Sequence, residues 1–244
     1  MKLKFVINED YLVIHVLSNM SQDRFSSSKY KKEIVSFQNL AWKKSKNCYN
    51  FLVSRFSPDD LSNKNIQSIA KELPSFLRTL KKSKQYKKVL SQTKEYLIFC
   101  KSQWDKNYQF TIKIMKELTG LKFNKTFAIY ITPPSLRNGI YLGNNKIAWG
   151  HSEDWLNYST IYLWHEVLHS YLSRSELNHA LIQFITDEEL RTRLNGRGYP
   201  PFVGHENLFP LMKRILPYWK KYLKSKSKNI MKFQRKLVKL KITQ

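Results

Sequence analysis

The segment from Tyr158 to Leu172 constrains this chain most, because it sets titratable side chains inside an apolar helical pattern. Its centre reads His-Glu-Val-Leu-His at 165–169. Residues four apart lie on one face of a helix, so both imidazoles point to the same side. Burying two histidines and a glutamate is unfavourable unless they are paired or bind a ligand. The pattern therefore predicts a largely buried helix that carries a polar site.

Zinc is the ion that this pattern favours. Catalytic zinc takes three protein ligands, often imidazole nitrogens, and keeps one position for water. His165 and His169 are the expected ligands, and Glu166 is the expected general base for the zinc-bound water. The motif thus indicates a zinc-dependent hydrolase, with peptide bonds as the expected substrate and other amides as an alternative. In the competing interpretation, both histidines are core residues that hydrogen-bond to backbone, and Glu166 lies at the surface.

A third ligand is expected from the next helix, predicted from Ser175 to Asn195 and stopped by Gly196. At about 100° per residue, Glu189 falls on the same helical stripe as His179. If that stripe faces the first helix, Glu189 completes the metal site. Three other side chains of this helix stay open as alternatives: Glu188, His179 and Asp187. A simple charged helix face would explain most of the acidic run equally well.

The run from His165 to Leu194 resembles a group of small bacterial gluzincin-like metallopeptidases. Their pattern is HExxH, then a helix with His-Ala, then Thr-x-x-Glu, which falls here on Thr186 and Glu189. A downstream Tyr-x-Pro element is similar to Tyr199-Pro200-Pro201, although more weakly. The likeness covers roughly Trp164 to Leu208. It implies a zincin-like fold, zinc and hydrolysis, and it names no substrate.

The sequence also departs from gluzincins such as thermolysin. Their third-ligand segment reads Asn-Glu-x-x-x-Asp, whereas Glu188 precedes Glu189 here and Arg193 replaces the aspartate. The carboxylate that orients a ligand in those enzymes is therefore missing from its usual place. Asp187 and Glu176 are the candidates to replace it.

Further side chains are candidates to support catalysis. Hydrolysis develops negative charge on the attacked carbonyl oxygen, which a tyrosine hydroxyl or a protonated histidine can stabilise. Tyr199 and His205 lie in the loop after the third-ligand helix, and His151 lies just before the HExxH helix. Ligand imidazoles also need carboxylates to orient them, for which Glu153 and Asp154 are available besides Glu176.

Beyond the motif, the pattern predicts an α+β chain dominated by helices. Alternation over 2–7 and 11–17 predicts a β-hairpin, and 30–42 and 63–73 are expected helices, with a restart at Pro74. Apolar residues at three- and four-residue spacings predict a long amphipathic helix that ends near Gly120; they are Trp104, Tyr108, Ile112, Met115 and Leu118.

Two short strands are expected just before the HExxH helix, around a turn at Gly143-Asn144-Asn145, and a third at 126–132. In the resembled enzymes an outer strand pairs with extended substrate. Ile147 to Gly150 is therefore a candidate substrate-binding edge. We expect three parts: an N-terminal hairpin and helices (1–120), a zincin-like core (121–206) and basic terminal helices (207–244).

The charge balance suggests a second kind of partner. The chain carries 43 Lys and Arg against 18 Asp and Glu, a formal charge of +25. Solvated lysines in a compositionally biased chain explain this, and so does attraction to nucleic acid or another anionic surface. Two alternatives to a general metallopeptidase follow: a nucleic-acid-associated SprT-like protease, or a non-enzymatic basic binding protein with a structural metal site.

The sequence also gives expectations about the compartment. No secretory signal and no transmembrane segment are evident, because no apolar run approaches the roughly 18 residues that a spanning helix needs. Cys48 and Cys100 are too few for a disulfide framework. A reduced, cytoplasmic protein is therefore expected.

Overall fold

The computed structural model describes residues 1–19, 28–53, 63–196 and 204–242. Helices dominate, which confirms the expected α+β class. The N-terminal half contains β1 (Lys2–Val6), α1 (Glu9–Ser18), α2 (Ser28–Lys44), α3 (Lys46–Leu52), α4 (Asn63–Lys82) and α5 (Lys84–Thr119). The next elements are β2 (Thr126–Ile131), β3 (Asn138–Gly143), β4 (Lys146–Gly150) and α6 (Tyr158–Leu168). The chain then forms α7 (Glu176–Gln183), the π-helical segment η3 (Phe184–Leu190), α8 (Arg191–Asn195), the 3-10 turn η4 (Glu206–Leu208), α9 (Phe209–Leu223) and α10 (Ile230–Lys239).

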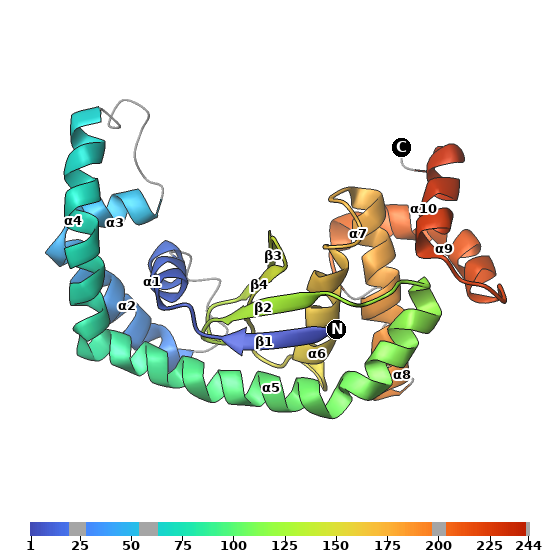
Figure 1. Ribbon diagram of the computed structural model, residues 1–244, viewed down its shortest axis with the longest axis horizontal. Coiled ribbons are helices and arrows are strands. Elements are labelled where there is room, and N and C mark those ends of the chain that lie inside the picture. The colour runs from blue at the N-terminus through green and yellow to red at the C-terminus, as the bar shows by residue number, and fades with distance from the viewer. Residues whose placement is uncertain (20–27, 54–62, 197–203, 243–244) are drawn as a thin grey trace.

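A four-stranded mixed sheet occupies the middle of the molecule, with α5 running along its underside (Figure 1). The strand order is β1-β2-β4-β3, with β1, β2 and β4 parallel and β3 antiparallel to β4. Alternate residues of β2 are buried, as expected for a sheet with one face on a core. Helices α1 to α4 lie at one end of the sheet, and α6 to α10 lie toward the other.

The predicted N-terminal hairpin is wrong in its second half, because residues 9–18 form helix α1. The Asn8 side chain accepts a hydrogen bond from the Tyr11 N–H, 3.0 Å away, and so caps the helix. Glu9 and Asp10 lie in its first turn, where negative charge is favoured. β1 pairs instead with β2, more than a hundred residues later in the chain.

The long helix α5 confirms the amphipathic pattern and its end. Trp104, Met115 and Leu118 are buried, and Gly120 closes the helix in the left-handed region at φ 66°. A side chain at Gly120 would collide with the backbone carbonyl of Lys228, so this position also needs glycine for space. The predicted restart at Pro74 did not occur: α4 continues through it, and its apolar stripe stays buried on both sides.

Two hydrophobic cores meet along α5. One gathers α1 to α4 with the first turns of α5, including Tyr86 and Val89; the other begins at Tyr96 and takes in the sheet, α6, α7 and the terminal helices. The change of core therefore falls inside α5, between Val89 and Tyr96. The helices of the described ranges include none with the length and apolarity needed to cross a bilayer.

Candidate metal centre

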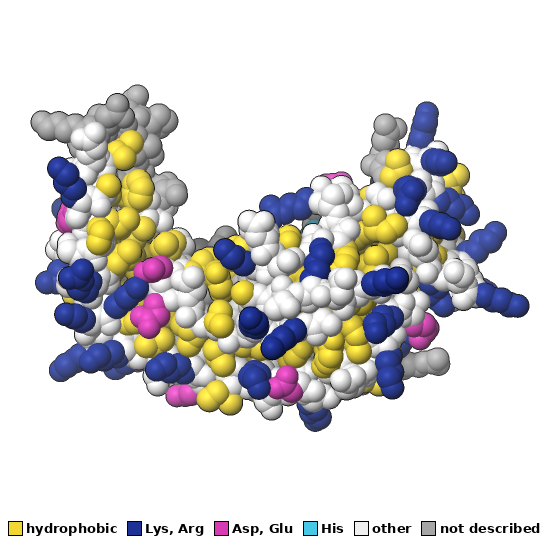
Figure 2. Space-filling model, viewed as in Figure 1, with side chains coloured by type: hydrophobic (Ala, Val, Ile, Leu, Met, Phe, Trp, Pro, Cys, Tyr) yellow, Lys and Arg dark blue, Asp and Glu magenta, His cyan; other side chains and the backbone are white. Residues whose placement is uncertain are grey.

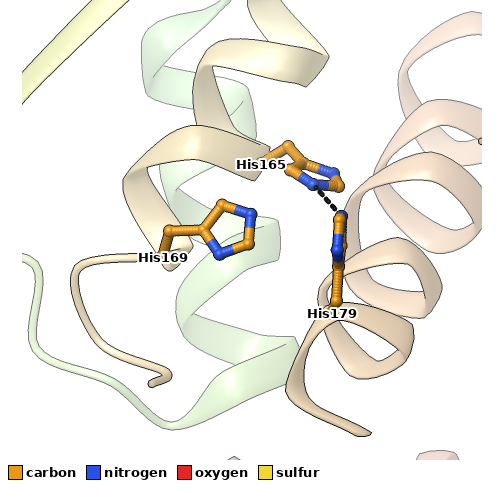
Figure 3. Close-up of side chains that lie close together, drawn as sticks. All are labelled: His165, His169 and His179. Atoms are coloured by element: carbon orange, nitrogen blue, oxygen red, sulfur yellow. Dashed lines mark hydrogen bonds between the residues drawn. The ribbon is translucent and has the colours of Figure 1, made fainter. Parts of the chain in front are cut away.

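Three imidazoles face one another at the junction of α6 and α7 (Figure 3). They belong to His165 in α6, His169 at its C-cap and His179 in α7. The ring centroids form a nearly equilateral triangle with sides of 5.0, 5.1 and 5.2 Å. One ligand atom from each ring lies within 4.8 Å of the other two.

This donor set fits a tetrahedral metal ion. Zinc–nitrogen bonds of about 2.05 Å imply a spacing of about 3.3 Å between two nitrogens on one ion. The Nε2 atoms of His165 and His179 are 3.1 Å apart, close to that value. Three imidazoles also match the ligand count of catalytic zinc, which leaves a fourth position for water.

His179, one of the alternatives, thus lies with His165 and His169, and the favoured Glu189 does not. The Glu189 carboxylate lies 3.2 Å from the Arg193 guanidinium, and Arg193 also pairs with Glu117 of α5 at 3.0 Å. Glu189 is thus held in a surface ion-pair network and is not part of the histidine group. Glu188, another alternative, does not belong to the group either.

The π-helical segment between Phe184 and Leu190 explains this change. Its hydrogen bonds span five residues instead of four, so each residue turns by roughly 80° and not 100°. Counted from His179, that difference brings Asp187 onto the His179 face and turns Glu189 to nearly the opposite side. The stripe that favoured Glu189 assumed a regular α-helix throughout 175–195.

Asp187 and Thr186 both contact the Nδ1 atom of His165. Asp187 is fully buried, and its Oδ1 lies 3.3 Å from His165 Nδ1 and 2.8 Å from the Thr186 hydroxyl, which donates to it. A carboxylate on Nδ1 fixes the tautomer and leaves Nε2 as the ligand atom. Asp187, an alternative third ligand in the sequence, therefore contacts the His165 ring and lies outside the group of three imidazoles.

The electrostatic environment keeps two of the rings neutral. Burial, then the charges of neighbouring histidines, lowers the pKa of His169 to about 4 and that of His179 to about 3. Burial would also lower the pKa of His165, but Asp187 and Glu166 together raise it. Since only a neutral imidazole binds a metal, His169 and His179 are ready to coordinate at neutral pH.

Glu166 lies beside the three rings and is 7 % exposed. Burial raises the pKa of its carboxyl, while the charge of His165 and a hydrogen bond from the Tyr141 backbone oppose that shift. Strand β3 lies close to Glu166. If Gly139 of this strand carried a Cβ atom, that atom would lie 3.9 Å from Glu166 Oε1 and 3.1 Å from the Trp149 ring. The alternative of a surface-exposed Glu166 does not hold.

A cleft of about 380 Å³ joins the histidines, Glu166 and strand β3. Its wall is the outer edge of β3, which pairs with β4 on one side only. The candidate edge at Ile147–Gly150 is therefore wrong: those residues belong to β4, which pairs with β2 and β3 on its two sides. Arg174 lines the same cleft and donates to the Tyr141 carbonyl at 2.8 Å.

Of the three side chains expected to stabilise charge on the carbonyl oxygen, only His205 is found in the cleft within the described residues. Tyr199 lies outside the described residues. His205 lines the cleft, with its ring centroid 4.6 Å from that of His179. His151 is turned away, because its ring bonds to the Ser152 carbonyl and the Tyr158 hydroxyl.

The three carboxylates expected to orient the ligand imidazoles are Glu153, Asp154 and Glu176, and within the described chain no hydrogen bond joins them to the histidines of the group. Glu153 accepts from the Ser159 N–H at 2.9 Å, at the start of α6, and so supports the helix instead of a ligand. Asp154 is 3.4 Å from the Ser152 hydroxyl. Glu176 lines the cleft in the first turn of α7.

Comparison with known proteins gave no match to a family model, to a curated protein or to a solved structure.

Proposed function

We propose that this protein is a zinc-dependent hydrolase of zincin-like architecture, acting on peptide bonds. The observation that carries the proposal is the convergence of His165, His169 and His179 beside Glu166 in one cleft. Three imidazoles alone would serve a structural site equally well. The buried carboxylate of Glu166 in the same cleft favours catalysis over a purely structural role.

Zinc held by the three imidazoles would lower the pKa of a water molecule and polarise the attacked carbonyl. Glu166 would accept the proton of that water at its carboxylate and then deliver it to the leaving amine nitrogen. His205, whose ring lies next to that of His179, would donate a ring N–H to the carbonyl oxygen and stabilise its negative charge. Asp187 would hold His165 in the correct tautomer throughout.

Strand β3 indicates how substrate would bind. It is an edge strand along the cleft, and an extended peptide could add to it as one more strand. The Tyr141 position is already engaged, since its carbonyl accepts from Arg174. The backbone around Gly139, which has no side chain to obstruct approach, is the proposed site of pairing.

The resemblance to gluzincins supports the HExxH part of this proposal, but the third ligand departs from it. A histidine ten residues after His169, on a helix that continues into a π segment, takes the place of their glutamate. We therefore propose a three-histidine zincin and not a gluzincin in the strict sense.

The proposal is tested by Glu166→Gln, assayed for zinc content and for cleavage of an unfolded protein such as casein. The amide keeps the size of the side chain but cannot accept a proton. We expect stoichiometric zinc and a loss of about 10²- to 10⁴-fold in kcat. Glu189→Gln is the matched control, because it makes the same change in the next helix, outside the cleft, and should keep both zinc and activity.

Cleavage by Glu166→Gln at the wild-type rate would rule out Glu166 as the base. A wild-type protein that binds zinc but cleaves neither casein nor a peptide library would favour the structural metal site instead.

A further inference from the structure

The terminal helices form a second, separate site of unusual charge. After Glu206 the sequence contains twelve Lys or Arg and no Asp or Glu. In the structure these cations lie on α9 and α10, between them or just after α10, and Figure 2 shows many Lys and Arg side chains at that end of the molecule. Every ion pair that the described residues form lies elsewhere, so these cations lack acidic partners within the described chain.

A groove of about 720 Å³ runs between α9 and α10 and shares no lining residue with the histidine cleft. Its cations come from both sides: Lys221 on α9, Lys228 just before α10, and Lys232 and Lys236 on α10. The last three follow one another at four-residue spacing. Like charges at that spacing repel along a helix, and the repulsion is relieved when an anion binds among them.

Aromatic rings form the floor and one rim of the groove. Tyr222 and Phe233 are buried and stacked, with ring centroids 4.6 Å apart. The Tyr222 hydroxyl donates to the Leu118 carbonyl at 2.8 Å, which anchors the floor to the end of α5. Tyr218, in contrast, is 37 % exposed and lines the groove. It therefore places an exposed aromatic ring beside the lysines.

We propose that this groove binds single-stranded nucleic acid. A row of lysines that follows a groove suits a phosphodiester backbone, and an exposed ring gives an unstacked base a surface to stack on. The bases of a duplex are already stacked and cannot use Tyr218. A bilayer surface would gain little apolar burial, because Ile230, Phe233 and Leu237 of α10 are buried in the protein. Val238 is the one largely exposed apolar side chain of α10.

The test measures binding of the full chain to labelled dT20 and rU20, a 20-base-pair duplex and vesicles containing phosphatidylglycerol. With four lysine contacts, log K should fall with log salt at a slope of about −3 for a single strand. Lys232→Glu/Lys236→Glu should weaken binding of dT20 at least about tenfold and flatten that slope. Tyr218→Ala should weaken binding about fivefold or more and leave the slope unchanged.

The matched control is Lys84→Glu/Lys87→Glu, which makes the same change in net charge at the far end of α5 (Figure 1). Both side chains are exposed, and binding should change by less than about twofold. Equal losses in the two double variants would show diffuse attraction and overturn the groove. Tighter binding to the duplex or to vesicles than to dT20 and rU20 would overturn the single strand as its ligand. Circular dichroism confirms that each variant is folded.

Discussion

The histidine cleft and the α9–α10 groove concentrate polar side chains in opposite ways. In the cleft three imidazoles surround one point, and His165 is buried and held by two neighbours at hydrogen-bond distance. In the groove the charged side chains are all lysines, and none has an acidic partner in the described chain. The cleft depends on the position of individual atoms, whereas the groove depends on charge density. Single substitutions should therefore damage the first far more than the second.

The largest effect is expected at His179. His179→Ala should lose zinc, falling below about 0.3 equivalents after reconstitution, because two imidazoles do not hold the ion. Glu189→Gln should bind one equivalent, since Glu189 is paired with Arg193. Elemental analysis of both purified variants makes the comparison. Retention of zinc by His179→Ala together with its loss from Glu189→Gln would restore the carboxylate as ligand.

A smaller effect on zinc binding is expected at Asp187, which contacts His165. Asp187→Asn removes the negative charge that holds His165 Nδ1 and should weaken zinc about 10- to 100-fold, the usual cost of losing such a partner. Competition with a chromogenic chelator measures the affinity. Asp154→Asn is the control, because that carboxylate lies in the loop before α6 and outside the histidine group. Equal affinities for the two variants would show that Asp187 has no part in metal binding.

The smallest effect concerns the metal-free protein in acid. His169 and His179 have pKa values of about 4 and 3 when folded, against 6.5 for the ordinary side chain. Between pH 6.5 and 4 the unfolded chain therefore binds more protons at these sites, so stability falls as the pH falls. The raised pKa of His165 acts in the opposite direction and reduces the net loss of stability.

Thermal melts of the chelator-treated protein at pH 7 and pH 4.5 measure this loss. A His169→Gln/His179→Gln variant should show a weaker dependence on pH, because glutamine does not titrate. A melting temperature that rises on acidification would contradict the lowered pKa values.

The sequence predicted the parts of this molecule that depend on local pattern. The α6 helix, the strand pair around Asn144, the long amphipathic helix and its end at Gly120 all follow from residue spacing and turn chemistry. The convergence of His165 and His169 also follows, because two residues four apart in a helix have little freedom. These features need no information from distant parts of the chain.

The predictions failed where contacts between distant parts of the chain determine the local structure. Nothing in the composition of 184–190 distinguishes a π-helical segment from an α-helix, so the expected side-by-side position of His179 and Glu189 did not occur. The order of strands depends on which edges meet, and β1 inserted next to β2 instead of forming a hairpin. Asn8 did carry a usable signal, since an Asn-Glu-Asp run is also the start of a capped helix.

The 36-residue helix α5 belongs to both hydrophobic cores, and at 1.5 Å per residue it is about 54 Å long. If either core unfolded by itself, the part of α5 that packs in that core would be exposed to solvent. The two halves are thereby thermodynamically linked, and the chain should behave as one cooperative unit despite its two cores. Ligand that tightens the histidine cleft would in this way also protect the helices at the far end.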